Sequence, residues 1–406
     1  MHKITGQLRR LLPRVVPTML VVPACIAQNQ PAPTGQQLVR PYAGLSATYD
    51  SNVLGLSNTA AAIALTNSPS MSDTSRIAFA GIDLQKTLGR QVLAAKLNAS
   101  QARFDRLTRL DYDGYDLSAD WIGELGNGWD GKLGYSRTFT LAPFTNFHGM
   151  ERNTLTVERE FANAGWKVHP NWRLRAGASH YAVAYDLPLQ KRYDRTERQS
   201  ELGVDYLTRR SNLLSLQWRR TDGRFQHQLG EQGPEFRQDQ LDIKLHWLVG
   251  GKTSIGFLGG RVARKHPGSA ERDFHGYNGR LNVKFTHSDK SAFSAGIWRE
   301  TGIFDDASTS YSTNLGASFS GRWAVTGKTG LEASWTRERR DFTRPSTMAA
   351  LPAFDDTLNT AQLALQHVAG NHLEFQLTLI SASKETSTGF GEYKRRAASA
   401  SARYRF

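Results

Sequence analysis

The sequence is short of two things that would narrow its class at once, cysteine and long apolar runs. Cys25 is the only cysteine among 406 residues, and it lies in a segment that we expect to be removed. The mature chain then has no disulfide and no thiol chemistry. No stretch after residue 30 reaches the roughly 18 apolar residues that a membrane helix needs. With a mean hydropathy of −0.48, the chain is either soluble or spans a membrane as strands, which are apolar on one face only.

Catalytic motifs are also lacking. There is no HExxH, and the histidines outside the leader are scattered. Two acidic pairs, Asp305-Asp306 and Asp355-Asp356, fall in expected outer loops. A carboxylate pair can bind a divalent cation, but here we interpret both as solvated loop residues. We therefore predict no catalytic residue, no metal and no cofactor, and a protein that is not an enzyme.

The first 27 residues have the layout of a secretory signal peptide. Lys3, Arg9, Arg10 and Arg14 form a basic region, residues 15–22 are apolar, and small residues from Ala24 to Ala27 precede a polar segment. We predict cleavage after residue 27, with 28–39 as a short periplasmic segment and 40–406 as one domain. The alternatives are a disordered basic leader and a lipidated Cys25.

The chain is strongly basic, with a formal net charge of +14. The leader contributes four basic and no acidic residues, so the mature chain carries 14 − 4 = +10. In a soluble protein such a charge indicates nucleic acid. For an exported protein we instead expect contact with anionic polysaccharide or lipid A phosphates, and no nucleic acid.

Turn-forming residues recur about every forty positions. Gly, Asn, Asp and Ser tolerate the backbone angles of tight hairpins. The short turns are centred in 88–90, 125–128, 167–171, 209–212, 250–252, 288–290, 326–328 and 370–372. Between them lie mostly longer breaks, at 51–74, 106–109, 141–151, 186–194, 223–235, 266–272, 302–308, 341–356 and 384–391. Alternation of short and long connections is typical of outer-membrane barrels, with short periplasmic turns and longer outer loops.

The segments between the turns alternate with a period of two residues. Leu241, Ile243, Leu245 and Trp247 interleave with polar residues, and the same pattern recurs at 373–379. Such sets point to opposite faces of a strand. Eight short turns and two termini on one side give eighteen strands. We predict an all-β fold, a transmembrane antiparallel up-and-down β-barrel of 16–18 strands in the cell outer membrane.

The C-terminal strand is the most specific local signal. Ala398, Ala400, Ala402, Tyr404 and Phe406 share its apolar face. A terminal aromatic residue on such a strand resembles the signal recognised by the barrel-assembly machinery, so we assign Tyr404 and Phe406 to this role.

The polar faces of the strands would line the interior. A barrel of this size leaves an aqueous channel, and basic rings favour anion passage. Some of these charges are expected to pair with acidic residues such as Asp120, Glu158, Glu201, Asp205 and Asp242. The Ala-rich segment 51–74 is predicted to fold inward as a partial constriction, with an exposed outer loop as the alternative. The predicted pore-lining residues are Lys96, Lys132, Arg173, Arg175, Arg219, Lys244, Arg280, Lys284, Glu332, Glu374, Arg403 and Arg405.

The predicted first strand ends in Tyr49-Asp50-Ser51-Asn52. A first strand ending in Tyr-Asp-x-Asn resembles the EpsL-type barrels found with exopolysaccharide machinery. The resemblance covers about a dozen residues, 42–53. It implies an outer-membrane porin for export of a secreted polysaccharide, working with periplasmic polysaccharide-export proteins and surrounded by outer-membrane lipid. It supplies no catalytic residues.

We therefore predict a passive conduit for polysaccharide with a polar, net basic lumen. The first alternative is a general or solute-selective diffusion porin. The others are a barrel enzyme acting on outer-membrane lipid and a soluble β-sandwich.

Overall fold

The computed structural model describes residues 37–144, 149–210, 212–227, 235–302, 311–343, 354–389 and 391–406. Nearly all of them lie in strands. The strands are β1 (Gln37–Asp50), β2 (Asp73–Leu88), β3 (Gln91–Phe104), β4 (Tyr112–Leu125), β5 (Trp129–Leu141), β6 (Thr154–His169), β7 (Trp172–Tyr185), β8 (Arg195–Leu207), β9 (Leu213–Phe225), β10 (Glu235–Val249), β11 (Thr253–Lys265), β12 (Phe274–Ser288), β13 (Ser291–Gly302), β14 (Tyr311–Ala324), β15 (Thr329–Thr343), β16 (Phe354–Ala369), β17 (Leu373–Thr386) and β18 (Tyr393–Arg405). The helical elements are α1 (Thr59–Thr66), η2 (Thr108–Leu110), η3 (Pro188–Tyr193) and η4 (Ala270–Arg272).

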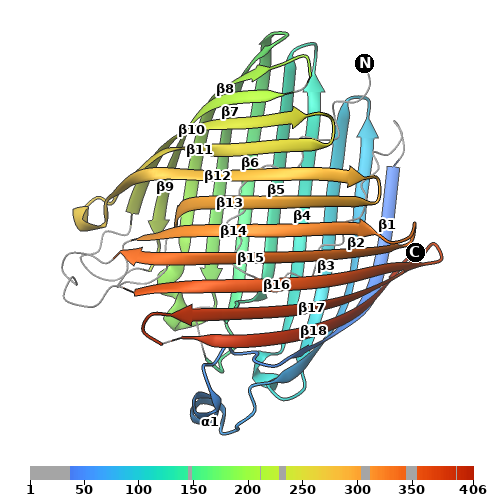
Figure 1. The fold of residues 1–406 in the computed structure, drawn as a ribbon, viewed down its shortest axis with the longest axis vertical. Helices are drawn as coiled ribbons and strands as arrows, with labels where there is room; N and C mark the ends of the chain where they lie inside the picture. The colour runs from blue at the N-terminus through green and yellow to red at the C-terminus, as the bar shows by residue number, and fades with distance from the viewer. Residues whose placement is uncertain are drawn as a thin grey trace.

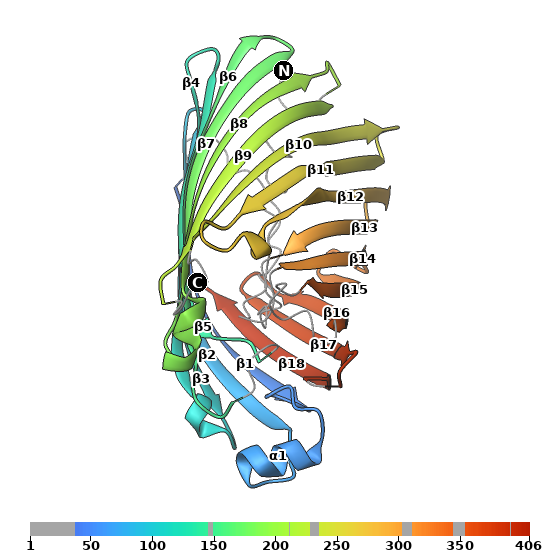
Figure 2. The same ribbon diagram turned by 90° about the vertical axis from the view of Figure 1, so that its left-hand side faces the viewer.

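The eighteen strands form one closed antiparallel barrel. Each strand pairs with its neighbours in sequence, and β1 also pairs with β18, from Tyr42 opposite Arg405 to Asp50 opposite Ala397. Figures 1 and 2 show the resulting tube, with the blue β1 beside the red β18 in Figure 2. Closure removes the free sheet edges. The predicted fold class and strand number are confirmed.

The two faces of the wall differ sharply in composition. The outward face carries exposed apolar residues such as Leu45, Leu202 and Ile297, which are 67%, 55% and 58% exposed. These are opposed along each ladder by further apolar residues, as Leu245 is by Leu214 and Phe257. Bulky aromatic side chains stand near the two edges of this apolar belt, among them Trp129, Trp166, Trp172, Trp247 and Trp323 toward one edge and Tyr115, Trp218, Tyr277 and Trp335 toward the other. An apolar belt between aromatic girdles suits a bilayer.

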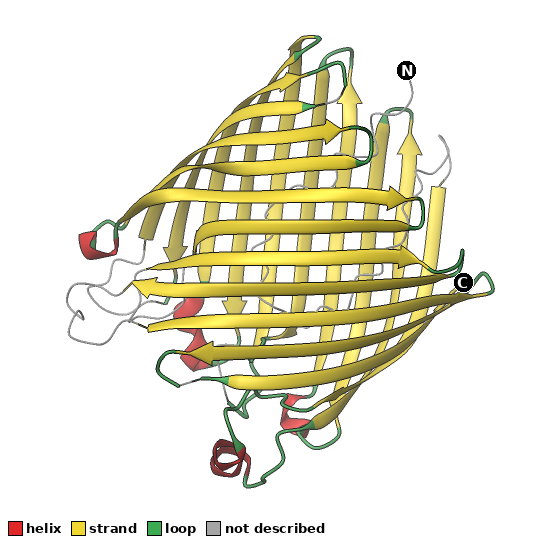
Figure 3. Ribbon diagram, viewed as in Figure 1, coloured by secondary structure: helices red, strands yellow, loops and turns green. Residues whose placement is uncertain are grey.

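The two ends of the barrel differ in their connections. All eight predicted short turns join strands at one end, where Gly89, Gly126, Gly250 and Gly370 adopt the positive φ that these turns require. The longer loops lie at the other end, together with every helical element of the described residues (Figure 3). We call these the turn end and the loop end. None of the described helices is long and apolar enough to cross a membrane.

The predicted inward fold of residues 51–74 is wrong. In the structure α1 lies beyond the ends of β1 and β2, at the rim (Figures 1 and 2). Leu54, Leu56 and Ala62 bury against Leu107 and Leu110 of the β3–β4 loop. Burial of these apolar side chains in a small core at the rim is what holds the segment away from the lumen.

Two further predictions are corrected. The barrel begins at Gln37, not at residue 40. Asp355 and Asp356 lie in β16 and not in a loop, because Arg339 and Arg340 of the neighbouring β15 pair with them. The leader, most of the predicted periplasmic segment, Cys25 and Asp305-Asp306 lie outside the described residues.

Candidate functional site

The inner wall of the barrel is the candidate site. All twelve residues predicted to line the pore lie on the face opposite the exposed apolar belt. For example, Arg403 and Arg405 alternate with the outward Tyr404 in β18, and Lys244 alternates with Ile243 and Leu245 in β10. The alternation of strand side chains therefore places this set on one surface, facing the barrel axis.

Glu158 is the exception among the acidic partners expected in the lumen. It opposes Arg137 and Ala182, on the outward side, and accepts a hydrogen bond of 2.8 Å from Tyr135 Oη. The Tyr135 hydroxyl donates to this carboxylate and Arg137 lies directly opposite it near the loop end, so it needs no partner in the lumen.

Arg175 is the centre of a continuous polar network on β7, β8 and β9. Its guanidinium donates to Asp205 at 2.9 Å and Glu201 at 2.8 Å, and also to Ser215 and Gln217. Asp205 is 2% exposed and also pairs with Arg173, while Glu201 pairs with Arg219. Three of the predicted basic residues, Arg173, Arg175 and Arg219, are thus neutralised by carboxylates on the adjacent strand. We call this set the paired wall.

Two other predicted arginines are paired in the same manner. Arg280 donates two hydrogen bonds to Glu300, of 2.8 and 3.0 Å, while its guanidinium lies 4.5 Å from the ring centroid of Trp298. Arg405 donates to Glu374 at 2.7 Å near the turn end. Guanidinium pairs of this kind hold each side chain in one orientation.

The remaining predicted basic residues have no ion pair with any described residue. Lys132 Nζ lies 4.8 Å from the Phe161 ring centroid, and the Arg403 guanidinium lies 4.8 Å from that of Tyr42. These contacts leave the positive charge without a carboxylate partner. We call this set the unpaired cations; its members are Lys96, Lys132, Lys244, Lys284 and Arg403.

Sequence reasoning missed several inward charges near the loop end. Asp356 is almost fully buried and pairs with both Arg340 and Lys384, at 3.7 Å for the lysine. Arg395 pairs with Asp50 at 2.6 Å across the closing seam. The same period-two alternation marks all of these residues, and only Asp356 and Lys384 fall within the predicted breaks.

The Tyr-Asp-x-Asn motif has a structural role at this seam. Asn52 is 1% exposed, donates to the carbonyl oxygens of Leu56 and Lys394, and accepts from the Leu56 backbone. Asp50 accepts from the Asn52 backbone at 2.9 Å. The motif thus joins the first strand, its loop and the last strand, whatever passes through the barrel.

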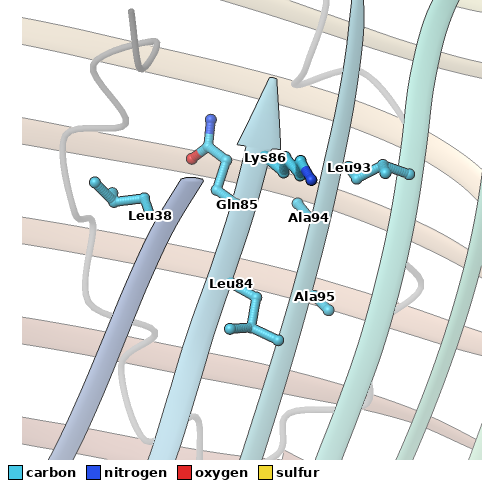
Figure 4. Close-up of a pocket in the computed structure, with 7 residues that line it drawn as sticks. All are labelled: Leu38, Leu84, Gln85, Lys86, Leu93, Ala94 and Ala95. Atoms are coloured by element: carbon cyan, nitrogen blue, oxygen red, sulfur yellow. The ribbon is translucent and has the colours of Figure 1, made fainter. Parts of the chain in front are cut away.

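Two small pockets lie on the barrel wall in the described part of the chain. A small pocket at the turn end of β1, β2 and β3 is lined mostly by apolar side chains, with Lys86 as its one ionisable group (Figure 4). In the described part of the chain, no three His, Cys, Asp or Glu residues are placed to hold a metal ion. The arginine–carboxylate network of the paired wall lies on the inner surface.

Solved structures with the same architecture are outer-membrane porins. A BenF-like porin from Pseudomonas fluorescens Pf-5 superposes with a TM-score of 0.50 at 10% sequence identity, covering 91% of this chain and 99% of that chain. OccK2 (OpdF) from Pseudomonas aeruginosa, solved in complex with glucuronate, gives 0.50 at 10% identity, with 92% and 100% covered. At this identity the likeness concerns the fold.

No family model matches the chain, and no curated protein matches it significantly. The resemblance to EpsL-type barrels therefore has no support from these comparisons, whereas an eighteen-stranded porin fold does.

Proposed function

We propose that the protein is an outer-membrane porin for the selective diffusion of small anionic solutes. The observation that carries the proposal is the inner wall, which combines a paired wall with the unpaired cations in a closed barrel of eighteen strands. Barrels of this size enclose an aqueous channel. Fixed ion pairs give the wall a constant shape, and cations without carboxylate partners raise the local concentration of anions.

Membrane location follows from the outward face. Apolar side chains that are half exposed, such as Leu241 and Ile243, would be costly to leave in water in such number. A bilayer covers them, and the short turns then face the periplasm and the loops face outward.

The test is ion selectivity in planar bilayers. Purified full-length protein in a KCl gradient should give a reversal potential of the sign for anion preference. In liposome swelling, glucuronate, the ligand in one porin of the same fold, should enter faster than glucose. Cation preference, or equal entry of the two solutes, would contradict the proposal.

Polysaccharide export, the function first implied by the resemblance, makes a different prediction. A deletion strain would accumulate polymer in the periplasm. Normal secretion in that strain, together with anion-selective conductance of the purified protein, supports the diffusion porin.

A further inference from the structure

Four arginines on the outward face lie at the edge of the apolar belt that is nearer the loop end. Arg220, Arg261, Arg299 and Arg337 stand on β9, β11, β13 and β15, on alternate strands. Each shares the outward face of its strand with apolar residues nearer the turn end. Examples are Phe257, on the same strand as Arg261, and Ile297, on the same strand as Arg299. They therefore face the surroundings of the barrel and not its lumen.

The strand register places these arginines at about one level. From Arg220 the ladder runs through Asp239 to Ala263, and Arg261 is two residues nearer the turn end. From Arg299 it runs through Leu315 to Arg339, and Arg337 is again two residues nearer the turn end. Two strands span about 10 Å, and a tilt of about 40° shifts the level by about two residues over that width. The two-residue offsets therefore compensate for the strand tilt, and the four arginines lie at about the same height along the barrel axis.

Three of the four arginines have no carboxylate partner among the described residues. Arg220 pairs with Asp239 at 2.8 Å. Arg261 instead lies between Leu241 and Tyr277, and Arg337 lies between Ala317 and Asn359. Within the described residues, the guanidinium of Arg299 donates to the backbone oxygen of Tyr277. All three side chains are exposed, so their remaining donors point to the medium.

Two facing positions between Arg261 and Arg299 are glycines and carry no side chain. Gly259 and Gly279 pair directly across β11 and β12, and a Cβ added at Gly259 would lie 2.9 Å from the Gly279 backbone. The exposed Phe257 packs its ring over this pair, with Cζ 2.8 Å from that Cβ position, and the half-buried Leu281 lies directly opposite Phe257. Arginines at the loop-end edge of an apolar surface match a lipid whose anionic headgroup adjoins its acyl chains.

We propose that Arg261, Arg299 and Arg337 bind the phosphate groups of lipid A, the phosphorylated glycolipid of the outer leaflet. The proposal rests on the outer-membrane location proposed above, because the arginines lie toward the loop end and hence on the external side. Guanidinium groups bind phosphate through paired, charge-assisted hydrogen bonds. Spacing of about 10 Å between alternate strands lets one lipid with two phosphates contact two arginines at once.

The experiment measures the heat-induced unfolding of the purified full-length protein with two probes, diphosphorylated lipid A and the same lipid without phosphates. The test variant is Arg261→Gln, Arg299→Gln and Arg337→Gln combined. The matched control replaces three outward arginines that have acidic partners, Arg76, Arg220 and Arg237, by Gln. We expect the phosphorylated lipid alone to raise the unfolding temperature of the wild type and the control. The test variant should need roughly tenfold more lipid for the same rise.

Equal stabilisation of the test variant, or equal effects of the two lipids on the wild type, would overturn the proposal. If the test variant does not fold, Arg299→Gln alone is measured in the same way. Because these residues face away from the lumen, the test variant should keep the reversal potential of the wild type. Loss of lipid binding with intact anion selectivity therefore separates this proposal from the proposed function.

Discussion

The paired wall and the unpaired cations share one surface but differ in their electrostatics. In the paired wall, Arg175 is held by Asp205 and Glu201 and is largely shielded. Lys132 and Lys284, farther around the same surface, have no ion pair with a described residue. Removing one partner of a partly buried ion pair destabilises the fold, because the other charge is left without compensation. Cations that remain unpaired act on mobile ions instead. The difference separates residues that shape the channel from residues that select its solutes.

The largest expected effect breaks the paired wall. Asp205→Asn removes the charge that Arg173 and Arg175 share, and leaves Arg173 with Asp130 and Arg175 with Glu201 as the remaining carboxylate partners. We expect a loss of about 3 kcal/mol of unfolding free energy, at the lower end for a buried pair because the lumen is hydrated. Urea unfolding of the refolded barrel, followed by gel mobility, measures it. As a control, Asp222→Asn disrupts the exposed pair with Arg237 and should cost below about 1 kcal/mol. Equal losses of unfolding free energy in the two variants would mean that the ion pairs of the paired wall stabilise the barrel no more than exposed ion pairs do.

The next effect concerns the unpaired cations. Replacing Lys132, Lys244 and Lys284 by Gln should leave stability nearly unchanged and reduce anion preference. One charge about 10 Å from an ion changes its energy by about 0.4 kcal/mol in water, or about twofold in local concentration. The reversal potential at low salt should therefore shift clearly, and the shift should shrink at 1 M salt through screening.

The matched control for that selectivity experiment removes three charges from the outward face, by Arg76→Gln, Arg220→Gln and Arg237→Gln. An equal shift in the control, or none in the lumen variant, would show that the unpaired cations do not set the selectivity.

The sequence predicts on which face of the wall most of the charged residues lie, but it does not predict which of them pair. The eight short turns and the alternation of strands such as 241–247 identify the barrel and the inward face of all twelve predicted residues. The pairing of charges could not be predicted, since Arg175 reaches Gln217 two strands away and that contact depends on register and rotamer. Glu158 was misplaced because the adjacent charges of Glu158, Arg159 and Glu160 obscure which face is polar. The rim position of residues 51–74 depends on a contact with Leu107 and Leu110, far along the chain.

The last effect concerns the loop end, where a buried histidine lies beside two arginines and its protonation affects stability. His266 follows β11 and is 7% exposed, with Arg264, Arg272 and Phe236 around it and Asp273 Oδ1 at 3.8 Å from its Nδ1. Burial and the two arginines lower the pKa of His266 from 6.5 to about 4. The unfolded chain therefore binds a proton more readily than the folded protein between these pH values. The contribution of His266 is fully present above pH 6.5 and is lost progressively as the pH falls toward 4, by about 1 to 2 kcal/mol at pH 5. Urea unfolding of the wild type and of His266→Gln at pH 7.5 and pH 5 measures the difference, which should be smaller in the variant. The same pH dependence in both proteins would mean that His266 is not held neutral by its surroundings.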